Sequence, residues 1–415
     1  MKKILLSMMV LCASFVSVLA QEDYKDAKTN YGYMNPIVSG VPSMSISPDA
    51  VAGGMGDVGV ATNADLNSQH WNPAKYAFME SQGGITVNYT PWLTKLVNDI
   101  NLAYIAGYYN MGDRIGALSA SFRYFSMGEV DIVGDQGDFW AKASPNEWAI
   151  DLAYSRKLHE YVSMAVAMRF LYSDLNNGIN FDGGADEMRA AWTMAADVAL
   201  YYKQPIATPM GESYFGLGLN ISNLGGKVTY NETTNHFIPA NLRLGVSYEL
   251  PFDDYNRLMA TVECNKMLVP TVYSKFGTEI VNGLPHYGIG DDSPYNSISS
   301  VNGWWQSFCD APGYTTDDGK VVSPLMEEFQ EVQLGVGLEY SYNRQFFGRV
   351  GYSHENFWKG NRRYVTVGAG FHLSIFSLDF AYCIATAASN PLNGTMRFTL
   401  GFDLAGIKDM VNNKK

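Results

Sequence analysis

Between residues 83 and 404 the chain breaks into fourteen segments in which apolar residues alternate with small or polar ones. The last segment shows this most clearly, because Phe398, Leu400 and Phe402 interleave with Arg397 and Thr399. Successive side chains of a strand point to opposite faces of its sheet, so one face of each segment is apolar and the other polar. An apolar face toward lipid and a polar face toward an enclosed lumen are typical of a transmembrane β-barrel.

The spacing predicts an all-β fold, a transmembrane antiparallel β-barrel of 14 strands preceded by an N-terminal plug. We expect strands over residues 83–90, 100–109, 114–127, 146–156, 161–173, 190–203, 213–222, 240–250, 256–265, 331–342, 345–354, 362–372, 376–385 and 394–404.

The gaps between these segments alternate between short and long. Outer-membrane barrels have short periplasmic turns and longer external loops, so the phase also predicts sidedness. Only the gap at 203–212 is longer than its phase requires. A soluble two-sheet protein would alternate along its strands too, but it would not need this regularity in loop length.

The first twenty residues have the charged, apolar and small-residue zones of a secretory signal peptide, with cleavage predicted after Ala20. A lipoprotein signal ending at Cys12 is disfavoured, because Leu11 is bulky and the apolar run would be halved. Removing Lys2 and Lys3 takes the formal charge from −12 to −14, which argues against nucleic acid as a partner. The later cysteines are odd in number and far apart, so the sequence predicts no disulfide framework and no metal site: Cys264, Cys309, Cys383.

Residues 21–82 do not alternate, and we expect a compact plug or hatch at the periplasmic mouth. Within it, Ser47 is the predicted helix cap and Pro48 the first helical residue. The barrel would span 83–404. An even number of strands returns both ends of the barrel to the same side, so the tail at 405–415 is predicted to be periplasmic.

One stretch of the plug carries a recognisable motif. Residues 49–62 read Asp-Ala-Val-Ala-Gly-Gly-Met-Gly-Asp-Val-Gly-Val-Ala-Thr, and Trp-Asn-Pro-Ala follows at 71–74. This region resembles the PorV/PorQ family of FadL-like outer-membrane barrels, with overall similarity closer to PorV. The residues that carry the resemblance are Gly53, Gly54, Gly56, Asp57, Asn72, Pro73 and Ala74.

The resemblance implies a non-enzymatic component of the Bacteroidetes type IX secretion system, without a cofactor. Such a protein would receive secreted cargo at the translocon SprA, bind the cargo's C-terminal signal domain, and deliver it to the attachment complex containing PorU. The alternative is a FadL-like importer of small hydrophobic molecules. That alternative requires an apolar internal pocket, whereas the predicted lumen residues are largely small or charged.

Strand parity places charges of both signs inside the predicted barrel. We expect them to pair and to clamp the plug, because a charge-selective pore would show rings of one sign. The predicted lumen charges are Arg123, Arg169, Arg243, Arg349 and Arg397 with Asp151, Asp197, Glu249, Glu263, Glu339, Asp379 and Asp403.

The gap at 266–330 is the longest predicted external loop and is rich in aromatic residues. Trp304, Trp305 and Phe308 are candidate partner-binding residues, because exposed aromatic clusters make good anchors. They stand near four tyrosines, and the alternative is that the whole set packs against the barrel mouth or the interfacial girdle: Tyr273, Tyr287, Tyr295, Tyr314.

Two further patterns bear on catalysis and on metal binding. His372 and Ser374 have the spacing of a base and nucleophile on one strand face, but parity directs His372 into the lumen and no orienting carboxylate is evident, so we predict no catalysis. Aspartates in the external loops lack EF-hand spacing and are expected to be solvated: Asp135, Asp138, Asp291, Asp292, Asp317, Asp318.

Overall fold

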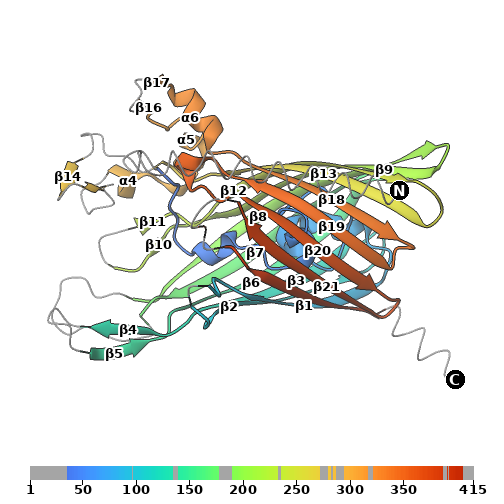
Figure 1. The fold of residues 1–415 in the computed structure, drawn as a ribbon, viewed down its shortest axis with the longest axis horizontal. Helices are drawn as coiled ribbons and strands as arrows, with labels where there is room; N and C mark the ends of the chain where they lie inside the picture. The colour runs from blue at the N-terminus through green and yellow to red at the C-terminus, as the bar shows by residue number, and fades with distance from the viewer. Residues whose placement is uncertain are drawn as a thin grey trace.

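The computed structural model describes residues 35–95, 97–133, 139–176, 189–231, 235–271, 279–281, 284–286, 294–315, 321–386, 390 and 392–404. In these residues fourteen antiparallel strands form one closed barrel, in which each strand pairs with the next and β1 pairs with β22 (Figure 1). The predicted signal peptide and C-terminal tail lie outside the described residues. No helix among the described residues is long and apolar enough to cross a membrane.

The predicted fourteen-stranded barrel is confirmed, and every predicted segment coincides with a barrel strand. The strands are β1 (Gly83–Pro91), β2 (Ile100–Asn110), β3 (Ala117–Met127), β6 (Asn146–His159), β7 (Val162–Asp174), β8 (Ala191–Thr208), β9 (Gly211–Gly225), β12 (Asn241–Pro251), β13 (Asn256–Met267), β18 (Gln333–Tyr342), β19 (Phe346–His354), β20 (Tyr364–His372), β21 (Phe376–Ala385) and β22 (Met396–Asp403).

The structure explains why the gap at 203–212 is longer than the other short connections. Strands β8 and β9 remain paired as far as Thr208 and Gly211, so only a two-residue turn joins them. What the sequence presents as a loop is therefore an extended hairpin that projects from the barrel (Figure 1). The regular alternation of short and long connections holds at this position as well.

The two faces of the strands differ as the alternation predicts. In β22, Arg397 and Thr399 are buried inside the barrel, whereas Phe398 and Leu400 are exposed on its outer wall. Phe398 lies beside Phe380 of the neighbouring strand, with ring centroids 5.3 Å apart. An outer wall of this kind suits lipid, because exposed apolar side chains cost nothing there.

The long connections gather at one end of the barrel, on the left in Figure 1, which we name the long-loop end. The opposite end, with the tight turns, is the short-turn end; by analogy with outer-membrane barrels the long-loop end is external. The elements at the long-loop end are β4 (Val130–Val133), β5 (Phe139–Ala143), β10 (Val228–Thr229), β11 (Asn235–His236), β14 (Glu279–Val281), β15 (Leu284–His286), α4 (Pro294–Ser297), α5 (Ser300–Gln306), β16 (Tyr314–Thr315), β17 (Val321–Val322), α6 (Pro324–Gln330) and η4 (Phe357–Lys359).

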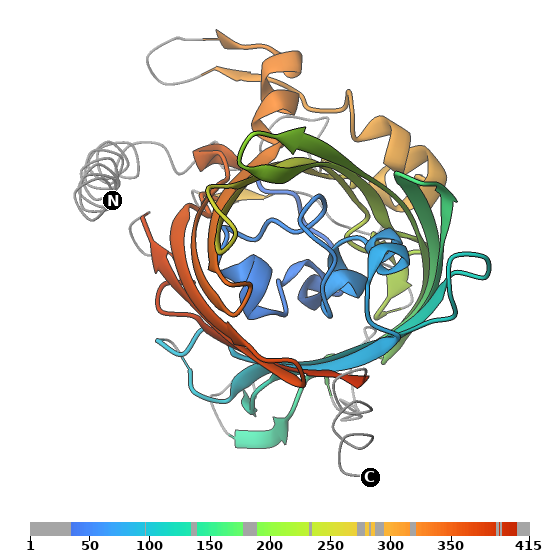
Figure 2. The ribbon, with the colours of Figure 1, turned by 90° about the vertical axis from the view of Figure 1, so that its right-hand side faces the viewer.

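Residues 35–82, here named the N-terminal segment, lie inside the barrel (Figure 2). The segment contains η2 (Pro42–Ser45), α2 (Ala50–Gly53), α3 (Ser68–Trp71) and η3 (Pro73–Phe78). Asn35 donates its backbone N–H to the carbonyl of Trp358 at the long-loop end, and Ser81 bonds Tyr108 near the short-turn end. The expected hatch at the periplasmic mouth is thus wrong in extent, because the segment runs through the whole lumen.

The expected start of the plug helix is also corrected. Asp49, not Ser47, caps α2, since its carboxylate accepts the backbone N–H of Ala52 at 2.9 Å. Pro48 consequently precedes the cap instead of occupying the first turn. The other Asp49 oxygen accepts the indole N–H of Trp71 at 2.7 Å, so tertiary contact decides which of the two residues caps the helix.

Glycines on the inner wall make room for the N-terminal segment. A Cβ added at Gly351 would overlap the backbone of Met55 and Gly56, and one added at Gly218 would overlap that of Val60. Gly216 and Gly337 also face backbone atoms of this stretch closely, whereas Gly245 and Gly335 lie against its valine side chains. Backbone therefore packs directly on backbone, which only residues without a side chain permit.

Candidate functional site

Buried charge pairs join neighbouring strands inside the barrel. Arg169 of β7 contacts Asp151 of β6 with Nε 2.5 Å from Oδ1, and Asp197 of β8 with Nη2 3.1 Å from Oδ2. All three side chains are almost fully buried. Breaking such a pair leaves an uncompensated buried charge, so this cluster holds three adjacent strands in register.

A second cluster surrounds Arg349 of β19. Its Nε lies 2.6 Å from Glu339 Oε2 and its Nη1 lies 2.6 Å from Asp379 Oδ1. His372 also contacts Asp379, with Nε2 3.0 Å from both carboxylate oxygens. The carboxylate that the sequence did not reveal is therefore present, but it is shared with Arg349.

The geometry around His372 is that of a structural contact. Its ring lies against that of Phe347, tilted by 39° with centroids 4.3 Å apart. Among the described residues, the hydrogen bonds of His372 lead to Asp379 and to the backbone of Gln345, and none leads to Ser374. A hydrolytic pair would need the nucleophile within hydrogen-bond reach of the base.

Other lumen arginines contact the N-terminal segment itself. Arg123 Nη1 donates to the carbonyls of Ser43 at 2.6 Å and Ile46 at 3.0 Å, and its Nη2 lies 3.0 Å from His70 Nδ1. Arg397 pairs with Asp57 at 3.3 Å. Charges from the barrel wall thus replace the water that would otherwise solvate this segment's backbone.

Glu263 and Glu249 take the same two roles, which are bonding the N-terminal segment and pairing with a charge of a neighbouring strand. Glu263 accepts the backbone N–H groups of Gly59 and Val60 at 2.8 and 2.9 Å, which ties the wall to the segment. Glu249 pairs with Arg257 at 2.6 Å, although the sequence did not single out Arg257. Asp403 is half-buried at the end of β22, where it pairs with Gly84 of β1 across the barrel seam.

The motif residues of the N-terminal segment occupy its tightest contacts. Gly56 has a φ of +77° and lies against the backbone of Tyr352, and an added Cβ at Gly53 would meet the side chain of Arg397. Gly54 faces the backbone of Gly368 in the same manner. Each glycine of the motif therefore has a steric reason at this place in the fold.

The Asn-Pro-Ala turn seats the segment near the short-turn end. Asn72 is fully buried; its amide donates to the carbonyls of Val60 and Leu200, and its side-chain oxygen accepts the N–H of Ala74. Pro73 begins η3, and the carbonyl of Ala74 accepts the hydroxyl of Ser163 at 2.7 Å. One side chain thereby links two parts of the segment to strand β8.

The aromatic residues of the long external loop fall into two groups. Trp305 is 73% exposed and Phe308 is exposed, while Trp304 is half-buried. Tyr295 is buried against Phe237, and Tyr314 lies beside Trp358 with ring centroids 5.6 Å apart. Tyr273 and Tyr287 lie outside the described residues, as do the six loop aspartates that were weighed for calcium.

Helix α6 of the same loop is amphipathic, but it exposes its apolar face and buries its acidic face. Leu325 and Phe329 are each 67% exposed, and Met326 is exposed too. The acidic residues Glu327 and Glu328 are buried. A surface helix ordinarily buries its apolar stripe and exposes its charges, so this arrangement requires a specific cause.

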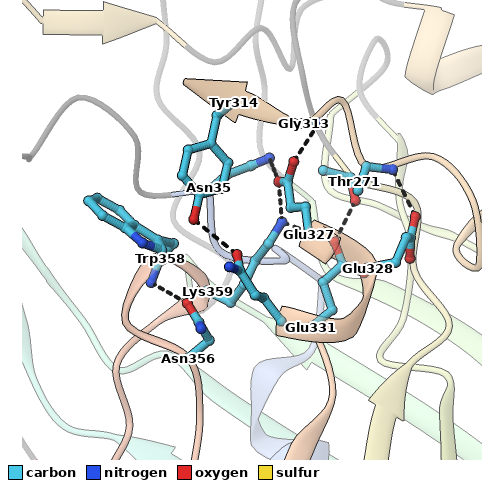
Figure 3. A network of polar contacts seen from close by, with 12 residues as sticks. Asn35, Thr271, Gly313, Tyr314, Glu327, Glu328, Glu331, Asn356, Trp358 and Lys359 are labelled. Carbon is cyan, nitrogen blue, oxygen red and sulfur yellow. Dashed lines mark hydrogen bonds and ion pairs between the residues drawn. The ribbon is translucent and has the colours of Figure 1, made fainter. Parts of the chain in front are cut away.

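The cause is an ion-pair network beneath the helix (Figure 3). Lys359 Nζ lies 2.6 Å from Glu327 Oε1 and 3.0 Å from Glu331 Oε1. Lys266, from the end of β13, lies 3.0 Å from Glu328 Oε2 and 2.7 Å from Glu331 Oε2. Two buried lysines thus hold the carboxylates inward, and the apolar residues between them face solvent.

Backbone groups complete the network. Glu327 Oε2 accepts the N–H of Gly313 at 2.7 Å, and Glu328 Oε1 accepts that of Ala311 at 2.8 Å. Sequence reasoning missed this helix. Its signal is a helical period, in which apolar residues at 325, 326 and 329 alternate with acidic residues at 327, 328 and 331. That period identifies two faces but does not say which one is buried.

Asp310 stands at the edge of the network. Burial raises its pKa to about 7, assisted by the nearby charges of Glu328 and Glu331 and opposed by hydrogen bonds from Thr271. The Thr271 backbone N–H donates to Asp310 Oδ2 at 3.0 Å. The loop therefore carries one carboxyl group that ionises close to neutral pH.

The family of the chain follows from its sequence. Residues 29–274 match the family described as "Type IX secretion system protein PorV". The chain belongs to the PorV family. Family and closed barrel together make this PorV-family protein an outer-membrane component of type IX secretion.

Three solved structures are similar to this PorV-family chain at low identity. The toluene transporter TbuX of Ralstonia pickettii is 12% identical, with a TM-score of 0.45, covering 85% of this chain and 96% of TbuX. The toluene transporter TodX of Pseudomonas putida is 11% identical, with a TM-score of 0.46 over the same shares. A Pseudomonas aeruginosa FadL homologue is 12% identical, with a TM-score of 0.41 over 89% and 99% of the two chains. No curated protein matches the sequence.

Proposed function

We propose that this PorV-family barrel is a non-catalytic carrier that holds secreted cargo on its external loops during type IX secretion. It would bind the C-terminal signal domain of the cargo at the translocon SprA and release it at the PorU-containing attachment complex. The observation that carries the proposal is the outward apolar face of α6, held by the buried pairs of Lys359 and Lys266. Trp305 of α5 and Phe308 just after this helix are exposed and belong to the same loop.

A binding role accounts for the energetics of this loop. Each large apolar side chain left in water forgoes roughly 25 cal/mol per Å² of burial. The chain nevertheless turns Leu325 and Phe329 outward and uses charged groups to fill the space beneath them. A preformed apolar surface of this kind binds a partner without first reorganising, which reduces the entropic cost of association.

Two parts of this loop carry exposed apolar side chains, one predicted from the sequence and one not. Trp305 and Phe308 follow Val301 along and just after α5, and all three are exposed. On α6 and the preceding strand the exposed apolar residues are Val321, Leu325, Met326 and Phe329. We name these seven residues the loop apolar surface. Aromatic and aliphatic anchors within a polar surround are the usual centre of a protein interface.

The importer alternative has less support from the lumen. The N-terminal segment runs the length of the barrel, and arginines and carboxylates of the wall bond it at several points. A passage for hydrophobic molecules would require these contacts to break, and buried pairs are costly to break. The carrier needs no such opening.

Capture of cargo tests the carrier proposal. In Phe329→Ala, we expect binding of an isolated cargo C-terminal domain to the purified barrel to weaken by about tenfold or more, the usual consequence of losing an interface anchor. The matched control is Phe139→Ala in β5, because Phe139 is 60% exposed in a different external loop. Deleting residues 299–312 should abolish binding while heat-modifiable electrophoretic migration stays normal. Equal loss in both phenylalanine variants, or unchanged binding in Phe329→Ala, would reject the loop apolar surface as the cargo site.

A further inference from the structure

A cavity of about 280 Å³ lies inside the barrel beside the N-terminal segment. Arg243 of β12 and Arg397 of β22 line it, together with Ser47 of the segment. Neither the secretion role nor the folding of the barrel accounts for this space. For scale, an engineered apolar cavity of about 150 Å³ holds one benzene molecule.

Arg243 brings hydrogen-bond donors to this cavity that the protein does not use. Its side chain is 95% buried, being 5% exposed, and within the described part of the chain its Nε and Nη1 have no hydrogen-bond partner. Its Nε lies 4.0 Å from Glu263 Oε1, which is beyond hydrogen-bonding distance. The face of the guanidinium rests 4.6 Å from the ring of Trp71. The group is thus held in place while part of its edge remains unsatisfied.

Two more donors lining the cavity are in the same condition. Among the described residues, Arg397 Nε and Ser47 Oγ also lack a hydrogen-bond partner, and both side chains are more than nine-tenths buried. Leaving a buried donor unsatisfied costs about 1 to 3 kcal/mol, and more for charged groups. Several such donors around one space are available to an incoming acceptor.

The carboxylates of the cavity wall contact groups other than Arg243 Nη1 and Ser47 Oγ, although Asp57 Oδ1 and the amide oxygen of Asn265 on the same wall have no hydrogen-bond partner among the described residues. Glu263 accepts two backbone N–H groups of the segment, and Glu355 accepts Nε and Nη2 of Arg362 at 2.8 and 2.7 Å. Asp57 accepts the hydroxyl of Tyr364 at 2.5 Å and pairs with Arg397. The spare donors therefore match an incoming negative group, and a single charge suits this wall better than a double one.

The rest of the lining indicates what that negative group is attached to. Ile46, Trp92 and Phe125 line the same cavity and belong to one apolar cluster. Charged donors and an apolar wall within one space fit an amphipathic molecule of modest size.

We infer that this lumen cavity is a binding site for a carboxylate carried on a small apolar body, with Arg243 as its principal anchor. The carboxylate could belong to a free organic acid or to the C-terminus of an inserted peptide. The inference does not depend on the proposed carrier role, since it rests on the cavity and its unpaired donors alone.

Calorimetry on the purified full-length barrel tests the charge requirement first. Benzoate should bind, and benzamide, which has the same shape without the charge, should bind at least about tenfold more weakly. Each ligand is supplied both during refolding and afterwards, so that entry into the lumen does not limit the result. Because this comparison uses the unaltered protein, it is decisive even if a variant fails to fold. The site is overturned if benzoate and benzamide bind equally well, or if neither benzoate nor the peptide acid described below binds.

A variant pair tests the anchor, and a peptide pair tests the source. Arg243→Gln should weaken benzoate binding by about tenfold or more, whereas Arg257→Gln, which alters an arginine paired with Glu249 elsewhere on the wall, should not. Undiminished binding in folded Arg243→Gln would remove Arg243 from the site. Binding of acetyl-Ala-Phe but not of its C-terminal amide, in the absence of benzoate binding, assigns the site to a chain terminus; binding of benzoate alone assigns it to a free acid.

Discussion

Buried charged side chains have opposite effects in the lumen and in the long external loop. In the lumen, Arg123 and Arg397 of the wall bond the N-terminal segment, and these polar contacts hold the segment inside the barrel. In the loop, Lys359 and Lys266 draw the carboxylates of α6 inward, and the apolar residues are left facing solvent. Buried ion pairs therefore hold the N-terminal segment inside the barrel, whereas in the loop they leave apolar side chains exposed. The comparison teaches that the surroundings of an ion pair, rather than the pair itself, decide whether the neighbouring residues are buried or exposed.

The backbones that meet in the lumen give the largest expected effect. In Gly351→Ala, the new Cβ would overlap the backbone of Met55 and Gly56, which cannot rotate away. We expect a loss of about 3 kcal/mol in the free energy of unfolding, measured by denaturant titration of heat-modifiable migration. Gly348→Ala in the same strand is the control, because nothing lies within 4 Å of its added Cβ. Similar stability of the two variants would show that the contact between the barrel wall and the N-terminal segment is not rigid.

The loop is expected to respond locally and less strongly. Lys359→Met removes the cation that contacts both Glu327 and Glu331, while Lys266 still holds Glu331. Hydrogen exchange should show α6 opening with a free energy lower by about 2 kcal/mol, and the barrel strands unchanged. Loss of protection in the strands as well would mean that loop and barrel are one cooperative unit, against the division drawn above.

The smallest effect concerns pH. Because burial raises the pKa of Asp310 to about 7, its protonated form is the one that the folded loop favours. The stabilisation is complete below the ordinary value of 3.8 and is lost as pH rises through about 7. Exchange protection of residues 321–331, corrected for intrinsic rates, should therefore be lower at pH 8 than at pH 5. Asp310→Asn should flatten this dependence, and an unchanged slope in that variant would assign it to another group.

The external loop shows where sequence reasoning fell short. Trp304, Trp305 and Phe308 were nominated together, yet Trp304 is half-buried and the two others are exposed. The sequence does not predict that the apolar face of α6 is exposed, because charged residues such as those at 327, 328 and 331 ordinarily lie on the solvent side of a helix. Only the positions of Lys266 and Lys359, far apart in sequence, reverse that expectation.

The N-terminal segment shows a similar division. Its glycines and its Asn-Pro-Ala turn are visible in the sequence, and each proves to occupy a close contact. Its path through the lumen is not visible, because Asn35 and Ser81 reach opposite ends through partners at Trp358 and Tyr108. Likewise the cap at Asp49 was missed in favour of Ser47, since both residues suit that position and Trp71 decides between them.

The sequence by itself determined the fourteen strands, their inward and outward faces and the alternation of short and long connections, because alternation and turn length are local properties of a chain. Tertiary structure decided the rest. Which glycine meets which backbone, which arginine keeps unsatisfied donors and which face of α6 turns outward all depend on residues distant in sequence, such as Lys359 for Glu327. Those contacts exist only once the barrel has closed, so no local pattern records them.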